Sequence, residues 1–152
     1  MSTLKDQLRT DLTSAMKARD KERAGTLRMV MASITEAEVA GKEAKELTDD
    51  EIITILTREA KKRREAATAF ADGGRAEQAE KETAEAAVIT EYLPAQLSAE
   101  EISDLVSKAI AQTGAAEEGM RAMGKVMGIL TPQTKGRADG GAVAAEVRKQ
   151  LA

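Results

Sequence analysis

Residues 92–101 read Tyr92-Leu93-Pro94-Ala95-Gln96-Leu97-Ser98-Ala99-Glu100-Glu101, a stretch that ends one helix and begins another. Pro94 disfavours helical geometry at Leu93, so a helix arriving from the N-terminal side is predicted to stop there. Ser98 and Glu101 have the spacing of a capping box, in which each side chain accepts a hydrogen bond from the backbone N–H of the other residue. We therefore predict a domain boundary here, with residues 1–94 before it and residues 95–152 after it.

Four helices are predicted before the boundary, because apolar residues recur there every three or four positions. The stripes of the first three are Leu4, Leu8, Leu12 and Met16; Leu27, Val30, Met31, Ile34 and Ala37; and Ile52, Ile53, Leu56, Ala60, Ala67 and Phe70. The N-cap candidates are Ser2 or Thr3, then Asp20, then the capping box of Thr48 and Glu51. Gly41 and Gly73-Gly74 are the expected stops of the second and third helices. The fourth helix, rich in alanine and charge, is predicted from Glu77 to Leu93.

Three more helices are predicted after the boundary. Their stripes are Ile102, Leu105, Val106, Ala109 and Ile110; Met120, Met123, Met127 and Leu130; and Val143, Val147 and Leu151. Gly114 is expected to end the first of them and Pro132 the second. No segment shows the period-two alternation of a strand. The prediction is an all-α fold of two small helical bundles in series, a four-helix N-terminal one and a three-helix C-terminal one.

The composition excludes several kinds of chemistry. The chain has no Cys and no His, so disulfides, thiolate catalysis, Cys/His zinc sites and Ser-His nucleophiles are ruled out. We predict no catalytic residue, no cofactor and no metal site, because the capping box already explains Asp49-Asp50-Glu51 and no other constellation stands out. No segment approaches the roughly 20 apolar residues of a membrane span, and no signal-peptide core begins the chain, so we expect a cytoplasmic protein.

Charge is unevenly distributed along the chain. The segment from Gly119 to Ala152 carries a net charge of +4, against −3 for the whole chain. Its cations are Arg121, Lys125, Lys135, Arg137, Arg148 and Lys149, and its carboxylates are Asp139 and Glu146. Such asymmetry indicates either an anionic partner for the C-terminal part or chance in a short segment.

Two features of the C-terminal part are candidate contact sites. Gly124 and Gly128 form a G-x-x-x-G, and each glycine costs a helix about 0.5–1 kcal/mol relative to alanine, so close approach of a neighbouring helix or of a ligand such as RNA is the expected reason. The segment Lys135-Gly136-Arg137-Ala138-Asp139-Gly140-Gly141 joins cations and glycines before a helix start. It fits a phosphodiester contact or an ordinary turn with Asp139 as the N-cap, and it lacks the order of a nucleotide-binding P-loop.

Two other features have ordinary structural explanations. The run Lys61-Lys62-Arg63-Arg64-Glu65 points its cations in four directions round a helix, so a solvated, salt-bridged surface is favoured over a nucleic-acid patch. The methionines at positions 120, 123 and 127 have core spacing, which favours a buried stripe over a partner-binding methionine surface.

Several of these stretches together resemble the YqeY family. They are Leu27-Arg28-Met29 through Ile34, the 61–65 run with Phe70, Glu91-Tyr92-Leu93-Pro94 with Gln96-Leu97-Ser98, and Met123-Gly124-Lys125-Val126-Met127-Gly128 followed by Lys135-Gly136-Arg137-Ala138-Asp139-Gly140. The resemblance covers nearly the whole chain and implies two helical bundles, of four and three helices.

The same unit resembles the C-terminal tail of GatB, a subunit of the glutamine-dependent tRNA amidotransferase. That tail holds tRNA while the chemistry lies in another domain, to which nothing in this chain is similar. The residues closest to the tail motif are Gly124, Val126, Met127, Lys135, Gly136 and Ala138. Asp139 stands where the tail commonly has Asn. The resemblance implies tRNA binding without catalysis, so a carbon–nitrogen ligase label would be inherited from GatB by name only.

The leading hypothesis is a tRNA-binding accessory protein. Its phosphate contacts are predicted to be Lys125, Lys135, Gly136, Arg137, Arg121 and Lys149, with Gly124 and Gly128 permitting close approach. With one Phe, one Tyr and no Trp, recognition by shape and charge is expected rather than base stacking. The alternative is a helical adaptor that docks on a protein partner, a synthetase or an amidotransferase.

Overall fold

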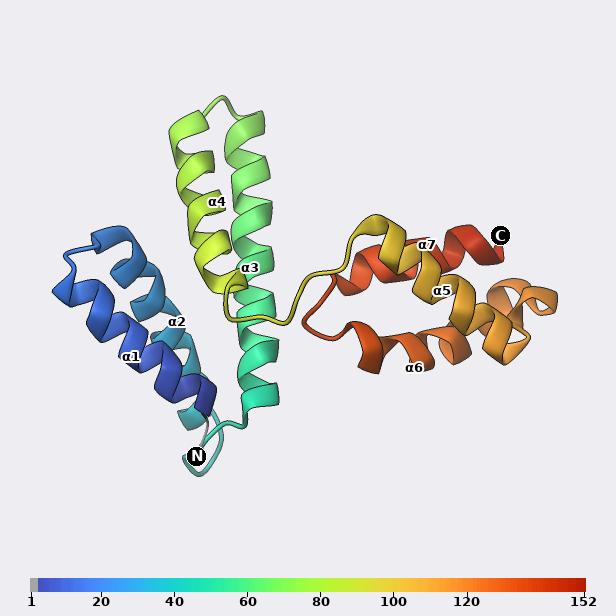
Figure 1. Ribbon diagram of the computed structural model, residues 1–152, viewed down its shortest axis with the longest axis horizontal. Coiled ribbons are helices and arrows are strands. Elements are labelled where there is room, and N and C mark those ends of the chain that lie inside the picture. The colour runs from blue at the N-terminus through green and yellow to red at the C-terminus, as the bar shows by residue number, and fades with distance from the viewer. Residues whose placement is uncertain (1–2) are drawn as a thin grey trace. The chain divides into compact units, whose positions relative to one another are not determined.

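The computed structural model describes residues 3–152, and it contains only helices as regular elements in that range. Their bounds are α1 Thr3–Lys17, α2 Lys21–Val39, α3 Asp49–Asp72, α4 Ala76–Thr90, α5 Ala99–Thr113, the 3-10 turns η1 Ala115–Glu117 and η2 Gly119–Ala122, α6 Met123–Thr134 and α7 Gly140–Leu151 (Figure 1). The predicted all-α class is confirmed. The contacts divide the chain into two compact units, Met1–Leu93 and Pro94–Ala152. That the units are a four-helix bundle and a three-helix bundle stays a prediction.

Three of the predicted helix starts are confirmed by their hydrogen bonds. In α3 the N–H of Glu51 donates to Thr48 Oγ1 at 3.2 Å, and the N–H of Thr48 donates to Glu51 Oε1 at 3.3 Å. In α5 the corresponding bonds of Ser98 and Glu101 are 3.1 and 3.0 Å. Asp20 Oδ1 accepts from the N–H of Arg23 at 3.1 Å at the start of α2. Each of these caps lies within four residues of sequence, which is why the sequence alone predicts it.

The first helix is capped in a different way from the prediction. Thr3 lies inside α1 rather than before it, and Ser2 lies outside the described residues. The carboxylate of Asp49, at the start of α3, accepts from Thr3 Oγ1 at 2.8 Å and from the N–H of Leu4 at 3.2 Å. A residue distant in sequence therefore supplies the acceptor, because the starts of α1 and α3 lie side by side.

Two helix ends fall earlier than predicted. Helix α2 ends at Val39, and its C-cap is Ala40 in right-handed geometry rather than Gly41. Helix α4 ends at Thr90, and the N–H groups of Tyr92 and Leu93 continue as tight turns toward Pro94. The predicted ends of α3 at Gly73 and of α5 at Gly114 are confirmed, and Gly114 has the positive φ of 68° that favours glycine.

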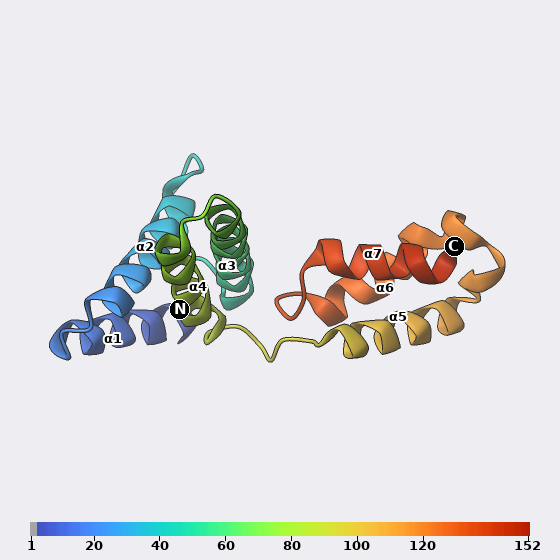
Figure 2. The ribbon, with the colours of Figure 1, turned by 90° about the horizontal axis from the view of Figure 1, so that it is seen from above.

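The N-terminal unit has a core shared by all four of its helices. Its buried residues are Leu8, Leu27, Val30, Ile34, Leu47, Ile52, Leu56, Ala60 and Ile89. Helices α3 and α4 form a long hairpin, which Figures 1 and 2 show side by side along its length. Between Arg63 and Ala86 no side chain of this hairpin is buried. Its distal half therefore projects beyond the core.

A polar network holds the end of α4 against α1 and α2. Tyr92 Oη donates to Asp11 Oδ2 at 2.5 Å, and Arg23 pairs with Glu91 at 2.8 Å. Burial, reinforced by the hydrogen bond to Asp11, raises the pKa of Tyr92 to about 12. The neutral phenol is the form that donates this bond, so the network requires Tyr92 to stay protonated.

Tyr92 is the chain's one tyrosine, so its ionisation can be followed directly. In a spectrophotometric titration we expect phenolate absorbance to appear near pH 12 in the folded protein. Because the folded pKa lies above the ordinary value of 10.0, the bond stabilises the fold below pH 10 and is lost as the pH rises through about 12. The Asp11→Asn variant should titrate at lower pH. Titration of the wild type near pH 10 would contradict this environment.

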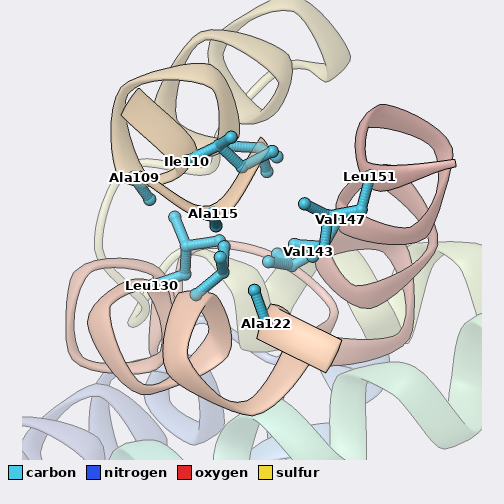
Figure 3. Close-up of a cluster of buried hydrophobic side chains, with 10 residues drawn as sticks. Ala109, Ile110, Ala115, Ala122, Leu130, Val143, Val147 and Leu151 are labelled. Carbon is cyan, nitrogen blue, oxygen red and sulfur yellow. The ribbon is translucent and has the colours of Figure 1, made fainter. Parts of the chain in front are cut away.

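The C-terminal unit has its own core, drawn in Figure 3. It comprises Val106, Ala109, Ile110, Ala115, Ala122, Val126, Leu130, Val143, Val147 and Leu151. Alanines from α5, η1 and η2 line part of it, and their short side chains let the helices approach closely. Met123 and Met127 pack against the cluster at its edge, as their spacing predicted.

Two expectations for α6 are wrong. Met120 is 49 % exposed, because residues 119–122 form a 3-10 turn and the α-helical spacing does not extend back past Met123. Pro132 lies inside α6, which continues to Thr134. Proline removes the hydrogen bond to the carbonyl of Gly128, and its ring crowds that carbonyl. Gly128 is exposed, so water can reach that carbonyl, and the helix ends two residues later.

Candidate functional site

The outer face of α6 brings together four of the predicted contact residues. The buried residues Val126, Leu130 and Thr134 define its inner side. Gly124, Gly128 and Lys135 follow one another at helical spacing on the opposite side, and all three are exposed. Lys125 is exposed beside them, about 15 Å along the helix axis from Lys135. We call Gly124, Lys125, Gly128, Thr131 and Lys135 the α6 face. Thr131 is not one of the contact residues predicted from the sequence.

The two glycines of the α6 face have no packing partner in the described chain. A Cβ built on Gly124 or on Gly128 would meet no atom within 4 Å. Within the C-terminal unit no neighbouring helix therefore approaches either glycine closely. Each glycine still weakens the helix by about 0.5–1 kcal/mol relative to alanine.

Lys125 is held only loosely by the protein. Its Nζ lies 3.4 Å from Glu118 Oε1, and both side chains are about half exposed. A surface pair of this kind contributes little free energy, typically below about 1 kcal/mol. The ammonium group can therefore exchange Glu118 for an external anion at small cost.

In the turn after α6, backbone groups that were expected to face a phosphate are bonded within the protein. Gly136, with φ of 73°, is buried, and its carbonyl accepts from Gln96 Nε2 at 2.8 Å. The carbonyl of Arg137 accepts from the N–H of Leu97 at 2.8 Å. The turn is therefore bonded to the segment that precedes α5, and the predicted contact by Gly136 stays a prediction.

Arg137 is also engaged within the unit. Its Nε donates to the carbonyl of Ala95 at 3.2 Å. The pKa of Glu101 is lowered, first by its bonds to Ser98 and also by the charge of Arg137. Arg137 thus fixes the start of α5 and keeps only part of its guanidinium for another partner.

The start of α7 carries its own anion. Gly140 and Gly141 lie in the first turn of α7 rather than in the preceding loop, and Asp139 occupies the N-cap position. A Cβ on Gly141 would lie 3.2 Å from Asp139 Oδ2, which places the carboxylate beside this turn. An anionic ligand would meet that carboxylate where the free N–H groups of a helix start otherwise favour negative charge. Asp139 is the N-cap residue, as the ordinary-turn explanation of this loop expects, and the phosphodiester contact stays a prediction.

The remaining predicted cations are Arg121 and Lys149, both exposed. Arg121 lies in η2, directly before α6. Lys149 precedes Gln150, which donates to the carbonyl of Ser103 in α5 at 3.0 Å. Lys149 lies in the last turn of α7 and is not a residue of the α6 face.

The Lys61–Glu65 run contains one residue that is not at the surface. Arg63 is only 5 % exposed, which contradicts the predicted solvation of the run at this position. Its guanidinium contacts Glu59 at 2.8 Å and Glu85 of α4 at 3.2 Å. Pairing at helical spacing is confirmed by this bond and by the 3.5 Å contact of Lys62 with Glu59. Glu85, the partner on α4, is 22 residues away in sequence, so no local pattern indicated that it would pair with Arg63.

The sequence profile of the family described as Yqey-like protein matches residues 5–151. The chain belongs to the YqeY family. One relative is "Altered inheritance of mitochondria protein 41, mitochondrial" of Pyrenophora tritici-repentis, 32 % identical over 136 residues that cover 87 % of this chain and 71 % of the relative. An uncharacterized protein of Schizosaccharomyces pombe is 33 % identical over 92 residues, which cover 60 % of this chain and 72 % of that protein.

Two features are absent from the described part of this YqeY-family chain. In residues 3–152 no helix has the length and apolar character needed to cross a membrane. In the same range no three His, Cys, Asp or Glu side chains are grouped as metal ligands.

Proposed function

We propose that this YqeY-family protein is a non-catalytic accessory that binds structured RNA of the tRNA class through the α6 face. The observation that carries the proposal is the pair of exposed glycines, with open space above them and lysines on either side. Glycine lets another backbone come close, and lysine supplies charge for phosphates. The resemblance to the tRNA-holding tail of GatB points the same way.

Recognition on this face would depend on shape and charge. The two aromatic residues, Phe70 and Tyr92, both belong to the N-terminal unit, so the C-terminal unit has no ring on which a base can stack. Arg121, Lys125 and Lys135 provide about three phosphate contacts. Binding should therefore be modest and salt-dependent, with log K falling by about 2 to 3 for each unit of log salt concentration.

Substituting both glycines separates this proposal from a purely structural role. The Gly124→Ala/Gly128→Ala variant should gain about 1–2 kcal/mol of stability, because each alanine favours the helix and meets no atom. The same variant should bind total tRNA more weakly, because its methyl groups occupy the space into which the RNA backbone comes. Urea unfolding followed by circular dichroism and fluorescence anisotropy with labelled tRNA measure the two effects.

The matched control is Lys125→Gln/Lys135→Gln, which should lose tRNA binding while its stability stays near that of the wild type. Stabilisation by the alanines with unchanged tRNA binding would show that the RNA does not approach the helix backbone. A wild-type protein that binds no tRNA at low salt would reject the proposal itself.

One observation favours a second candidate, the helical adaptor. A groove of about 420 Å³ lies between α2 and α4 of the N-terminal unit, lined by Gly25, Met29, Ala84 and Val88 among others. Met29 is 52 % exposed there. We propose a synthetase or an amidotransferase as the partner. Docking in this groove should survive Lys125→Gln/Lys135→Gln and weaken with Met29→Glu, which affinity capture with a purified partner can measure.

The cellular location is proposed separately. The printed name of the Pyrenophora relative places that protein in mitochondria. For this chain we propose the cytoplasm, and cell fractionation tests it.

A further inference from the structure

We propose that Met29 is a site of reversible oxidation by peroxide, and that its sulfoxide fastens α2 more firmly to α3. Met29 lies in the middle of α2, and its sulfur accepts a hydrogen bond from the buried guanidinium of Arg63 in α3. The proposal does not depend on RNA binding, because neither residue belongs to the α6 face.

One nitrogen of the Arg63 guanidinium is bonded to sulfur, while the other two are bonded to oxygen. Nε donates to Glu85 Oε2 at 3.2 Å, and Nη1 donates to the carbonyl and to Oε2 of Glu59 at 3.1 and 2.8 Å. Nη2 donates to Met29 Sδ at 3.7 Å, the one acceptor that the structure gives it among residues 3–152. A thioether is a weak acceptor, whereas a charged donor forms its strongest bonds with oxygen. Since Arg63 is buried, water cannot readily make up for this weak bond.

Two polar contacts join α2 and α3 at this crossing, and both are long. Besides the bond to Met29, Ser33 Oγ donates to Glu59 Oε1 at 3.4 Å. Ser33 lies one turn after Met29 on α2, and Arg63 lies one turn after Glu59 on α3, so each pair shares one side of its helix. Strengthening either contact would therefore strengthen the attachment of α2 to α3.

Peroxide can reach Met29 in the folded protein. The residue is 52 % exposed and lines the groove of about 420 Å³ between α2 and α4. A lone pair of the sulfur would attack one oxygen of hydrogen peroxide, so that an S–O bond forms and the O–O bond breaks. The second oxygen leaves with both protons as water, and the two electrons that sulfur loses are gained by the peroxide. Methionine sulfoxide reductases reverse this oxidation.

The sulfoxide would form the bond that the thioether forms poorly. Its oxygen is attached to the sulfur that already accepts from Nη2, so a charge-assisted N–H···O bond would replace the N–H···S contact. Oxidation of a buried methionine disrupts a core, because it places a polar group there. About half of Met29 is in solvent, so this cost is small and the expected effect on stability has the opposite sign.

Met29 is the one methionine of residues 3–152 whose sulfur accepts a hydrogen bond. Three others pack against the two hydrophobic clusters, and they are Met31, Met123 and Met127. Their oxidation is expected to weaken the fold in the usual way. Stabilisation by peroxide would therefore be specific to Met29.

The test uses the Met16→Leu/Met31→Leu background, in which Met29 is the one methionine left among residues 3–93. After mild treatment with hydrogen peroxide, mass spectrometry of the tryptic peptide from Met29 to Lys42 should show one added oxygen. The equilibrium constant for unfolding of the N-terminal unit, measured in urea by Tyr92 fluorescence, should then fall roughly tenfold. A methionine sulfoxide reductase should restore the original value. An unchanged or larger unfolding constant after oxidation would overturn the proposal.

The matched control adds Met29→Leu to the same background. Peroxide should leave its Tyr92 transition unchanged, and a shift as large as that of the parent would overturn the assignment to Met29. The wild type tests access, because Met16 and Met29 are 51 % and 52 % exposed. Met29 should be oxidised alongside Met16, and a Met29 that stays reduced when Met16 is fully oxidised would overturn the proposal.

Met29→Gln tests the contact without any oxidation. Its side-chain carbonyl supplies an oxygen acceptor, and both glutamine and leucine are good helix formers. We expect the unfolding constant of Met29→Gln to be several-fold below that of Met29→Leu, and the difference to vanish in Arg63→Met/Glu59→Gln/Glu85→Gln, which has no guanidinium. Equal stability of the two Met29 variants beside Arg63, or the same difference without Arg63, would overturn the proposed bond.

Discussion

Replacing Arg63 by alanine is expected to destabilise the N-terminal unit by about 3–5 kcal/mol, the usual effect of removing one partner from a buried ion pair. The side chain is 6 % exposed and its partners Glu59 and Glu85 are 15 % and 16 % exposed. Without the guanidinium, two poorly hydrated carboxylates lie close together with no strong donor. Urea unfolding followed by tyrosine fluorescence measures this unit alone, because Tyr92 is the chain's one tyrosine and there is no tryptophan.

The pH dependence provides a check on this explanation. Burial raises the pKa of Glu59, but the hydrogen bond from Arg63 and the charge of Lys62 outweigh it, so the net pKa is lowered from 4.5. A lowered pKa means that this contribution is present above about pH 4.5 and is lost as the pH falls further. The difference in stability between wild type and Arg63→Ala should therefore shrink in acid.

A compensated variant separates the loss of charge from the loss of volume. Arg63→Met with Glu59→Gln and Glu85→Gln removes all three charges and should recover most of the stability. A loss below about 1 kcal/mol in Arg63→Ala would contradict the burial of this cluster.

The Leu130→Ala substitution is expected to unfold most of the C-terminal unit. Leu130 is fully buried in a core drawn partly from alanines, and truncation of such a leucine costs about 2–5 kcal/mol. A unit of about 60 residues buries only a small core, so its free energy of unfolding is small. Circular dichroism should lose the helical signal of α5, α6 and α7, while the fluorescence of Tyr92 reports an intact N-terminal unit.

This variant also tests whether the two units unfold separately. Its control is Ile129→Ala, the half-buried neighbour, which should lose much less stability. We expect an unchanged Tyr92 transition in Leu130→Ala, and a Tyr92 transition that moves together with the circular dichroism would show that the units unfold as one.

The parts of the fold that sequence predicts are those decided within one turn of helix. The capping boxes of Thr48 with Glu51 and of Ser98 with Glu101 need only a four-residue window, and the structure contains both. The burial that spacing predicted for Met120 is wrong. Gly119, with φ of 62°, and the 3-10 turn that it begins change the helical phase before Met123. A pattern of spacing does not reveal where a helix of another type interrupts it.

The burial of the candidate site residues depends on partners that are distant in sequence, unlike the helix caps. Arg63 is turned inward by Glu85, and Gly136 is buried because Gln96 and Leu97 bond to its turn. None of these partners is near in sequence. The sequence singled out Gly124 and Gly128, but only the structure shows that the space above both is open.

The distal half of the α3–α4 hairpin, residues 64–85, contains no buried side chain. Its length is therefore not fixed by core packing. Residues added in equal numbers to both helices beside Gly73 and Gly74, one helical turn at a time, would move the tip outward and leave the hydrophobic cluster of the unit untouched. Selection can thus change how far the hairpin reaches without changing how tightly the unit packs.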